Sequence, residues 1–212
     1  MIVCDPDLSD ERRVMITNVG GAATIAALSP AMAARVLVRP LRDESELRAA
    51  LADAHVLLHP PDAVFYFSLA AKEELLGEPA QANVRRLTKD DRDAFVAFTS
   101  AAPAQDVDDA FVELDHWAVF GAFDEQQLMC AASTYPWDGS DLVDLGVLTL
   151  PDFRRRGLAR AVVREICRHA YGESREPQYR CQLENRASRA LAASAGLTWF
   201  ADWEVVSPQS PV

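Results

Sequence analysis

The strongest helical pattern in the chain begins directly after Gly157. Apolar residues recur there at intervals of three and four and share one face, while arginines at 160, 164 and 168 occupy the other: Leu158, Ala159, Val162, Val163, Ile166, Cys167 and Ala170. The segment before it, DLVDLGVLTL (141–150), is apolar enough to predict a strand, and Pro151-Asp152 marks a turn. The pattern therefore predicts a strand, a turn and an amphipathic helix in succession.

From residue 83 onward, the apolar positions predict a mixed α/β sheet. Expected strands cover 83–88, 116–123, 128–135, 141–150, 178–184 and 201–206. Expected helices cover 89–100, 104–114, the segment after Gly157 and 185–196. The order is one strand, two helices, three strands, and then helix, strand, helix and strand, which is typical of a sheet with helices packed on it.

Residues 1–82 carry a second and smaller set of patterns. DESELRAALADA (43–54) predicts a short helix with acidic residues in its first turn, and AVFYFSL (63–69) predicts a strand. Gly20-Gly21 favours a turn over a nucleotide-binding loop, and Gly77-Glu78-Pro79 ends the segment. We therefore expect an N-terminal α/β lobe of unknown role at 1–82 and a second domain at 83–208.

Composition and charge restrict the classes of function. Of 212 residues, 50% are hydrophobic and 25% are charged, as in a globular protein with a full core. The net charge of −11 argues against a general surface for nucleic acid or anionic membrane. Four scattered cysteines without ligand spacing indicate neither a disulfide framework nor a metal site. Without a signal-peptide pattern or an apolar run of about 18 residues, a cytoplasmic protein is the default expectation.

Three consecutive arginines, at 154–156, precede Gly157 in this acidic chain. The first turn of a helix leaves backbone N–H groups unpaired, and the helix dipole adds about half a positive charge there. Gly157 and Ala159 are small enough to let an anion approach the backbone closely. A solvated turn is the plainer interpretation of the arginines alone. Together with the small residues at a helix start, they predict a pyrophosphate site.

Two motifs carry a resemblance to a known family. Arg154-x-x-Gly157-x-Ala159, after a strand and a proline, resembles the pyrophosphate-loop signature of the GNAT superfamily of N-acetyltransferases. The stretch NRASRALAASAGL (185–197) resembles the family's second motif, with Leu197 where phenylalanine is usual. The element order from residue 83 also agrees. The resemblance implies a GNAT-like mixed and mostly antiparallel sheet flanked by helices, with acetyl-CoA as co-substrate and no metal.

The resemblance also implies which residues meet the co-substrate. The backbone of Val147, Leu148 and Thr149 would run beside the acetyl and pantetheine portion in the manner of an added strand. Asn185, at the start of the later helix, would hydrogen-bond the cofactor, and it would also serve as a plain N-cap. The pyrophosphate would lie against the loop and first helical turn formed by Arg154, Arg155, Arg156, Gly157, Leu158, Ala159 and Arg160.

Direct attack of a neutral primary amine on a thioester needs a base for the ammonium proton and an acid for the leaving thiolate. Asp144 is the expected base, because strand alternation places it on the face opposite its apolar neighbours. Asp141, Glu184, Tyr135 and His116 are the alternatives. The proton chemistry is thus expected to depend on a carboxylate beside the cofactor strand.

The position of the family's usual tyrosine acid is occupied here by Ala192. Tyr135 and Trp137 are expected to line the acceptor pocket.

Two functions stay open: an acetyl-CoA-dependent N-acetyltransferase acting on a primary amine of a small molecule or peptide, and a CoA-binding regulatory module, which the missing tyrosine favours. The net acidity favours a cationic acceptor, no nucleic acid or membrane partner is expected, and a homodimer is one open option.

Overall fold

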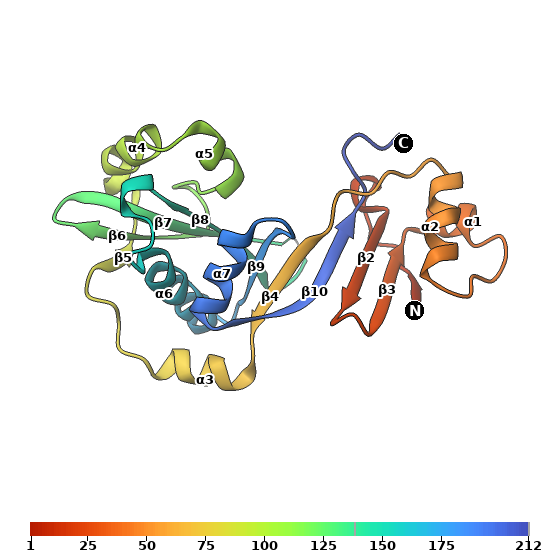
Figure 1. Cartoon of the computed structure of the whole chain (residues 1–212), viewed down its shortest axis with the longest axis horizontal. Coiled ribbons are helices and arrows are strands. Elements are labelled where there is room, and N and C mark those ends of the chain that lie inside the picture. The colour runs from red at the N-terminus through yellow and green to blue at the C-terminus, as the bar shows by residue number, and fades with distance from the viewer. Residues whose placement is uncertain (138, 212) are drawn as a thin grey trace. The chain divides into compact units, whose positions relative to one another are not determined.

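The computed structural model describes residues 1–137 and 139–211, which divide into two compact units (Figure 1). The first unit comprises Met1–Val64, Cys181–Asn185 and Trp199–Val212, and the second comprises Phe65–Arg180 and Arg186–Thr198. Strands β4, β9 and β10 each have residues in both units. The expected domain boundary after residue 82 lies inside the second unit, between α3 and β5.

The first unit is a small sheet with helices on one face. Its strands lie in the order β1-β3-β2-β10, with β1 parallel to β3 and the other pairs antiparallel. Side chains from β2, β3 and both helices form its core. Gly20 and Gly21 make the turn between β2 and β3 with φ of 56° and 68°, so the expected turn is confirmed. The elements are β1 (Ile2–Cys4), η1 (Asp10–Arg12), β2 (Val14–Val19), β3 (Ala23–Leu28), α1 (Pro30–Val36), α2 (Glu44–Asp53) and β10 (Leu197–Val205).

The start of each helix in this unit is set by its sequence. Ser29 caps α1 by accepting from the Met32 N–H, and Pro30 occupies the first helical position. Asp43 caps α2 by accepting a hydrogen bond from the Glu46 N–H, so the helix expected over 43–54 is confirmed.

The second unit contains a larger sheet whose strands lie in the order β4-β9-β8-β7-β6-β5. Strands β5 to β8 pair antiparallel, and β9 runs parallel to β8. The expected fold class, a mixed and mostly antiparallel sheet flanked by helices, is therefore confirmed. The strands are β4 (Asp62–Phe67), β5 (Val84–Arg86), β6 (Ala118–Asp124), β7 (Gln127–Pro136), β8 (Leu142–Thr149) and β9 (Glu176–Gln182).

Helices cover both faces of this sheet. In Figure 1, α4 and α5 lie on one side of strands β6 to β8, and α6 lies on the other. The apolar face predicted after Gly157 is the face that α6 buries, because Val162, Val163, Ile166, Cys167 and Ala170 are all 0% exposed. The helices are α3 (Leu69–Gly77), η2 (Lys89–Asp91), α4 (Arg92–Ala101), α5 (Ala104–Ala110), η3 (Pro151–Phe153), α6 (Leu158–Gly172) and α7 (Arg186–Ala195).

Two expected elements differ from the structure by four residues at one end. The helix expected over 104–114 ends at Ala110, because Phe111 adopts a left-handed backbone conformation with φ of 46°. The last strand begins at Leu197 rather than at residue 201. Within residues 1–137 and 139–211, no helix combines the length and the apolar character needed to cross a bilayer.

Candidate functional site

The parallel pairing of β8 with β9 stops before β8 ends. The registered pairs run from Leu142↔Glu176 to Leu145↔Tyr179, whereas β8 continues to Thr149. Its other edge remains paired with β7 through residue 149. In the described part of the chain, residues 146–149 of β8 therefore have no paired residue on β9. An open strand edge of this kind binds an extended ligand through main-chain hydrogen bonds.

The start of α6 follows β8 after a short turn. Gly157 stands at the N-cap position with φ of 80°, and Arg155 has φ of 60°. A Cβ built on Gly157 meets no atom within 4 Å, so the space in front of this backbone is open. Gly157 has no side chain to cap the helix, so no side-chain cap satisfies the first N–H groups of α6, as an anion site requires.

The arginines before Gly157 are held differently from one another. Arg154 lies 2.6 Å from the Asp106 carboxylate on α5, and its Nε donates to the Thr149 carbonyl at 3.2 Å. Arg156 donates to the Asp152 carbonyl at 2.8 Å. Arg155 and Arg160 are exposed on either side of Gly157. Arg154 thus links the end of β8 to α5, while the other arginines add positive charge around the start of α6.

Gly146 lets α5 approach the backbone of β8. A Cβ at Gly146 would lie 2.1 Å from the Ala110 carbonyl oxygen and 3.0 Å from that of Phe111, so only glycine fits there. Gly146 is also the first β8 residue beyond the registered pairs with β9. The end of α5 therefore lies against β8 at the point where the open edge begins.

Asp144 lies two residues earlier on the same face of β8 and is 2% exposed. Its Oδ2 accepts a hydrogen bond from the Tyr135 hydroxyl at 3.1 Å and lies 2.7 Å from the Arg180 guanidinium. Its Oδ1 accepts a weaker bond from the Gln178 amide at 3.4 Å. The Tyr66 hydroxyl donates to Gln178 in turn. The residue expected to be the base is thus the centre of a buried polar cluster.

Tyr135 connects this cluster to a group of three rings. The rings of Phe111, His116 and Tyr135 have centroids 5.1 to 5.2 Å apart. Burial lowers the pKa of His116, and this effect outweighs the opposing field of nearby carboxylates, so the imidazole is neutral near pH 7. Burial and the charge of Asp144 raise the pKa of Tyr135 to about 12, so its phenol stays protonated. Phe111 is 48% exposed, which leaves one side of the ring group open to solvent.

The other residues expected on the acceptor side have different surroundings. The Arg180 guanidinium lies 5.9 Å from the ring centroid of Trp137, so Trp137 borders the Asp144 cluster. The Asp141 side chain is 86% exposed and lies 3.8 Å from Arg175. Among the described residues, no group of histidine, cysteine and carboxylate side chains is placed to hold a metal ion.

The second motif contains the remaining expected residues. Asn185 is exposed and directly precedes α7, the position expected of an N-cap, and it belongs to the first unit, as does Glu184. Ala192 is 0% exposed on the buried face of α7. A side chain at that position in this chain therefore faces the core of the second unit.

Several residues of the site were missed by sequence reasoning. Gln178 and Arg180 alternate in the expected strand 178–184, so the sequence contained a signal that they share one face. Nothing in the sequence set the register that places Gln178 opposite Asp144. The roles of Gly146 and Phe111 depend on where α5 ends, and the expected helix was four residues too long.

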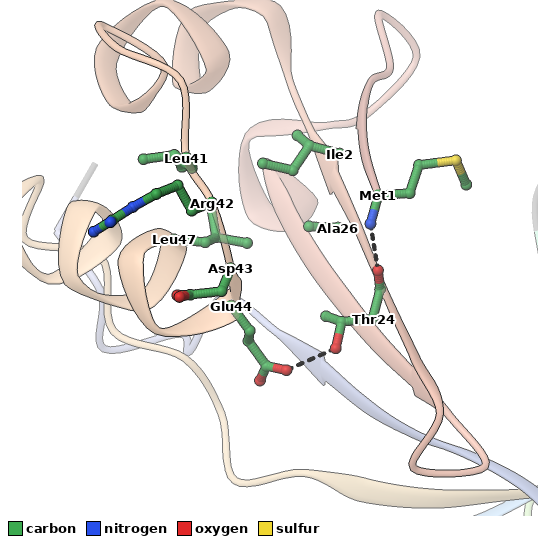
Figure 2. A pocket seen from close by; sticks show the side chains of 9 residues that line it. All are labelled: Met1, Ile2, Thr24, Ala26, Leu41, Arg42, Asp43, Glu44 and Leu47. Atoms are coloured by element: carbon green, nitrogen blue, oxygen red, sulfur yellow. Dashed lines mark hydrogen bonds between the residues drawn. The ribbon is translucent and has the colours of Figure 1, made fainter.

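The first unit contains a cavity of about 320 Å³, shown in Figure 2. Glu44 accepts a hydrogen bond from the Thr24 hydroxyl at 2.7 Å on its wall, and the Met1 amino group donates to the Thr24 carbonyl at 2.7 Å. None of the residues expected to bind cofactor or acceptor lines this cavity. We therefore assign this cavity no role in binding cofactor or acceptor.

A comparison with known families identifies the fold that carries the open edge of β8 and the uncapped start of α6. The GNAT acetyltransferase family model matches residues 80–206, more than half of the chain, and the chain belongs to this family. No curated protein matches the chain at a significant level.

Two solved structures of the GNAT family share this fold. An acetyltransferase of the GNAT family from Colwellia psychrerythraea is 19% identical with a TM-score of 0.55, over 75% of this chain and 60% of that protein. A GNAT-family acetyltransferase from Novosphingobium aromaticivorans is 16% identical with a TM-score of 0.52, over 86% and 83% of the two chains. An aminoglycoside N-acetyltransferase, AAC(6')-Iy, in complex with CoA is 23% identical with a TM-score of 0.42, over 53% and 89%. The chain thus spans less than two thirds of the Colwellia protein.

Proposed function

We propose that this protein is an acetyl-CoA-dependent N-acetyltransferase that moves the acetyl group to a primary amine of a small molecule or peptide. The observation that carries the proposal is the end of β8–β9 pairing at Leu145, directly before the strand edge that leads to the start of α6. Acetyl-CoA supplies the activated acyl group. The protein contributes an extended edge for the pantetheine and a helix start for the pyrophosphate.

We assign the cofactor residues by their place along the open edge of β8 and at the start of α6. The backbone of Val147, Leu148 and Thr149 binds the acetyl and pantetheine portion along the open edge. The loop and first turn from Arg154 to Arg160 bind the pyrophosphate, with N–H groups as donors and Arg155, Arg156 and Arg160 as surrounding charge.

The acceptor binds on the face of β7 and β8 that carries Tyr135 and Asp144, with Trp137 at its border. A backbone N–H of the β8 edge stabilises the oxyanion that forms when the amine attacks. Asp144 is the final acceptor of the amine proton. Its ion pair with Arg180 fixes the carboxylate in place.

The charge near this face favours a cationic acceptor. Residues 104–116, which include α5 and the loop after it, contain no lysine or arginine. The same segment carries five carboxylates: Asp106, Asp108, Asp109, Glu113 and Asp115. A negative field over the ring group raises the local concentration of amines that carry additional positive charge.

A CoA-binding regulatory module is the second candidate. It is favoured by Ala192, because the position of the family's usual tyrosine acid is an alanine with no exposed surface. Such a module would bind acetyl-CoA at the same place and would transfer nothing.

One experiment distinguishes the two candidates. The protein is first titrated with acetyl-CoA by calorimetry, and thiol release is then followed with n-propylamine, spermidine, kanamycin and lysine as acceptors. The transferase predicts binding, amine-dependent thiol release and a product heavier by one acetyl group. Binding without any amine-dependent release identifies the regulatory module, and absence of binding contradicts both candidates.

A further inference from the structure

Asp144 is buried and held by protein groups on both carboxylate oxygens, which disfavours direct contact with an acceptor amine. The residue is 2% exposed, and both carboxylate oxygens accept hydrogen bonds from protein groups. A general base must lie within about 3 Å of the proton that it removes, or be connected to it by one bridging group.

We propose that Tyr135 is a catalytic residue that passes the proton of the attacking amine to Asp144. This inference rests on the proposed transferase function and specifies the proton route of the same site. Tyr135 is the group that both touches the Asp144 carboxylate and belongs to the ring group with exposed surface at Phe111.

The three donors to Asp144 differ in what they can do. Arg180 keeps its proton at any pH in which proteins are stable, so it supplies only positive charge. The Gln178 amide donates a hydrogen bond at 3.4 Å, but an amide does not exchange protons on the time scale of catalysis. A hydroxyl is both donor and acceptor, so the Tyr135 hydroxyl can accept one proton while it gives up another.

The surroundings of Tyr135 support concerted transfer over a stable phenolate. Its pKa is raised to about 12 by burial and by Asp144, against the lowering effect of Arg180. His116, the other titratable group that packs against the ring, is neutral because burial lowers its pKa. Tyr135 therefore begins as a neutral phenol whose O–H already points at the carboxylate, and its own proton must leave as another arrives.

The step balances in protons and in bonds. The amine nitrogen forms a bond to the acetyl carbon and passes a proton to Oη of Tyr135, while the Tyr135 proton moves to Oδ2 of Asp144. The carbon–sulfur bond of the thioester breaks, and the thiolate carries the electron pair away. The proton on Asp144 then returns through Tyr135 to the thiolate or to water, which restores the starting state without any oxidant or reductant.

A matched pair of substitutions tests this route. Tyr135→Phe removes the hydroxyl that touches Asp144, whereas Tyr66→Phe removes a hydroxyl that donates to Gln178. Tyr66 is a close control because its pKa is also raised to about 12 by burial and Asp144. Both variants and Asp144→Asn are compared with the wild type on the best acceptor among n-propylamine, spermidine, kanamycin and lysine.

The relay predicts that Tyr135→Phe lowers kcat/KM by about 10²-fold, within the range for one general acid–base group, while Tyr66→Phe changes it by less than about threefold. Acetyl-CoA affinity stays the same in both. The double variant Tyr135→Phe/Asp144→Asn should lose little more than either single variant, since both remove the same relay.

A second measurement covers the case in which Tyr135→Phe fails to fold. Site-specific replacement of Tyr135 by 3-fluorotyrosine keeps the hydroxyl and its hydrogen bond but lowers the phenol pKa. The relay then predicts a new decline of kcat/KM at high pH, where the phenol has lost the proton that it must hand on. An unchanged pH profile contradicts the relay.

The outcomes separate the two proposals. If the wild type binds acetyl-CoA but acetylates none of the four amines, the proposed function is wrong and the relay falls with it. If the wild type is active and Tyr135→Phe matches Tyr66→Phe, the relay is wrong and the transferase stands. Additive losses in the double variant likewise contradict a shared route.

Discussion

The cofactor loop and the Asp144 cluster lie in the same unit, but the sequence encodes them in opposite ways. The loop from Arg154 to Arg160 is one contiguous segment whose geometry follows from a glycine with φ of 80° at a helix start. The cluster around Asp144 is assembled from three strands, with Tyr135 on β7, Asp144 on β8, and Gln178 and Arg180 on β9. The cofactor half is thus specified locally, and the acceptor half is specified by the register of the sheet.

The largest expected effect is a loss of cofactor binding at the loop from Arg154 to Arg160. Gly157→Val should lower acetyl-CoA affinity by about 10³-fold, or roughly 4 kcal/mol, because a β-branched side chain would fill the open space in front of the first α6 amides. Isothermal calorimetry on the folded variant measures the loss.

Gly21→Val is the matched control, since Gly21 also has a positive φ, of 68°, and a Cβ there also meets no atom within 4 Å. Its acetyl-CoA affinity should equal that of the wild type. A folded Gly157→Val protein with unchanged affinity would remove the loop from the cofactor site.

The next largest effect is a loss of activity at the Asp144 cluster without a loss of cofactor binding. Asp144→Asn keeps the shape of the side chain and removes its basicity, so kcat/KM should fall by about 10²-fold with acetyl-CoA affinity nearly unchanged. Asp141→Asn, three residues earlier and exposed, should be nearly silent. A loss of equal size at every pH would make Asp144 a structural residue and would leave the proton acceptor to another group.

A third substitution acts where the two halves meet. Gly146→Ala would place a methyl group 2.1 Å from the Ala110 carbonyl, so the end of α5 must shift. We expect unfolding in urea to report a loss of roughly 1–3 kcal/mol, the usual cost of an overpacked contact. Gly172→Ala, with no atom within 4 Å, should cost less than about 0.5 kcal/mol. Equal stability of the two variants would show that α5 does not rest on β8 as described.

The smallest expected effect concerns a single arginine. Arg154→Ala should weaken acetyl-CoA binding by about tenfold, near the lower end of the range for a charged hydrogen bond, because the backbone amides still hold the pyrophosphate. Asp106→Asn removes the partner of Arg154 on α5 and should change affinity by less than about threefold. A loss of 10³-fold in Arg154→Ala would instead make this side chain the main anion ligand.

The same contrast explains how much of the molecule could be predicted. The helix after Gly157 and the strand before it followed from apolar spacing, and the order of elements from residue 83 was correct throughout. The partners of Asp144 could not be derived, because a period of two places Gln178 and Arg180 on one face without saying which strand residue lies opposite them. The left-handed Phe111 also had no local signal, since glycine or asparagine usually marks such a helix end.

The most direct test of the central claim is amide hydrogen exchange in the intact protein with and without acetyl-CoA. The account predicts increased protection at two separate segments, residues 146–149 of β8 and the amides from Arg156 to Arg160 at the start of α6. Segments that take no part, such as the Gly20-Gly21 turn, should exchange at unchanged rates. Protection confined to other segments, or no change at a saturating concentration of acetyl-CoA, would contradict the assignment of the open β8 edge and the α6 start as the cofactor site.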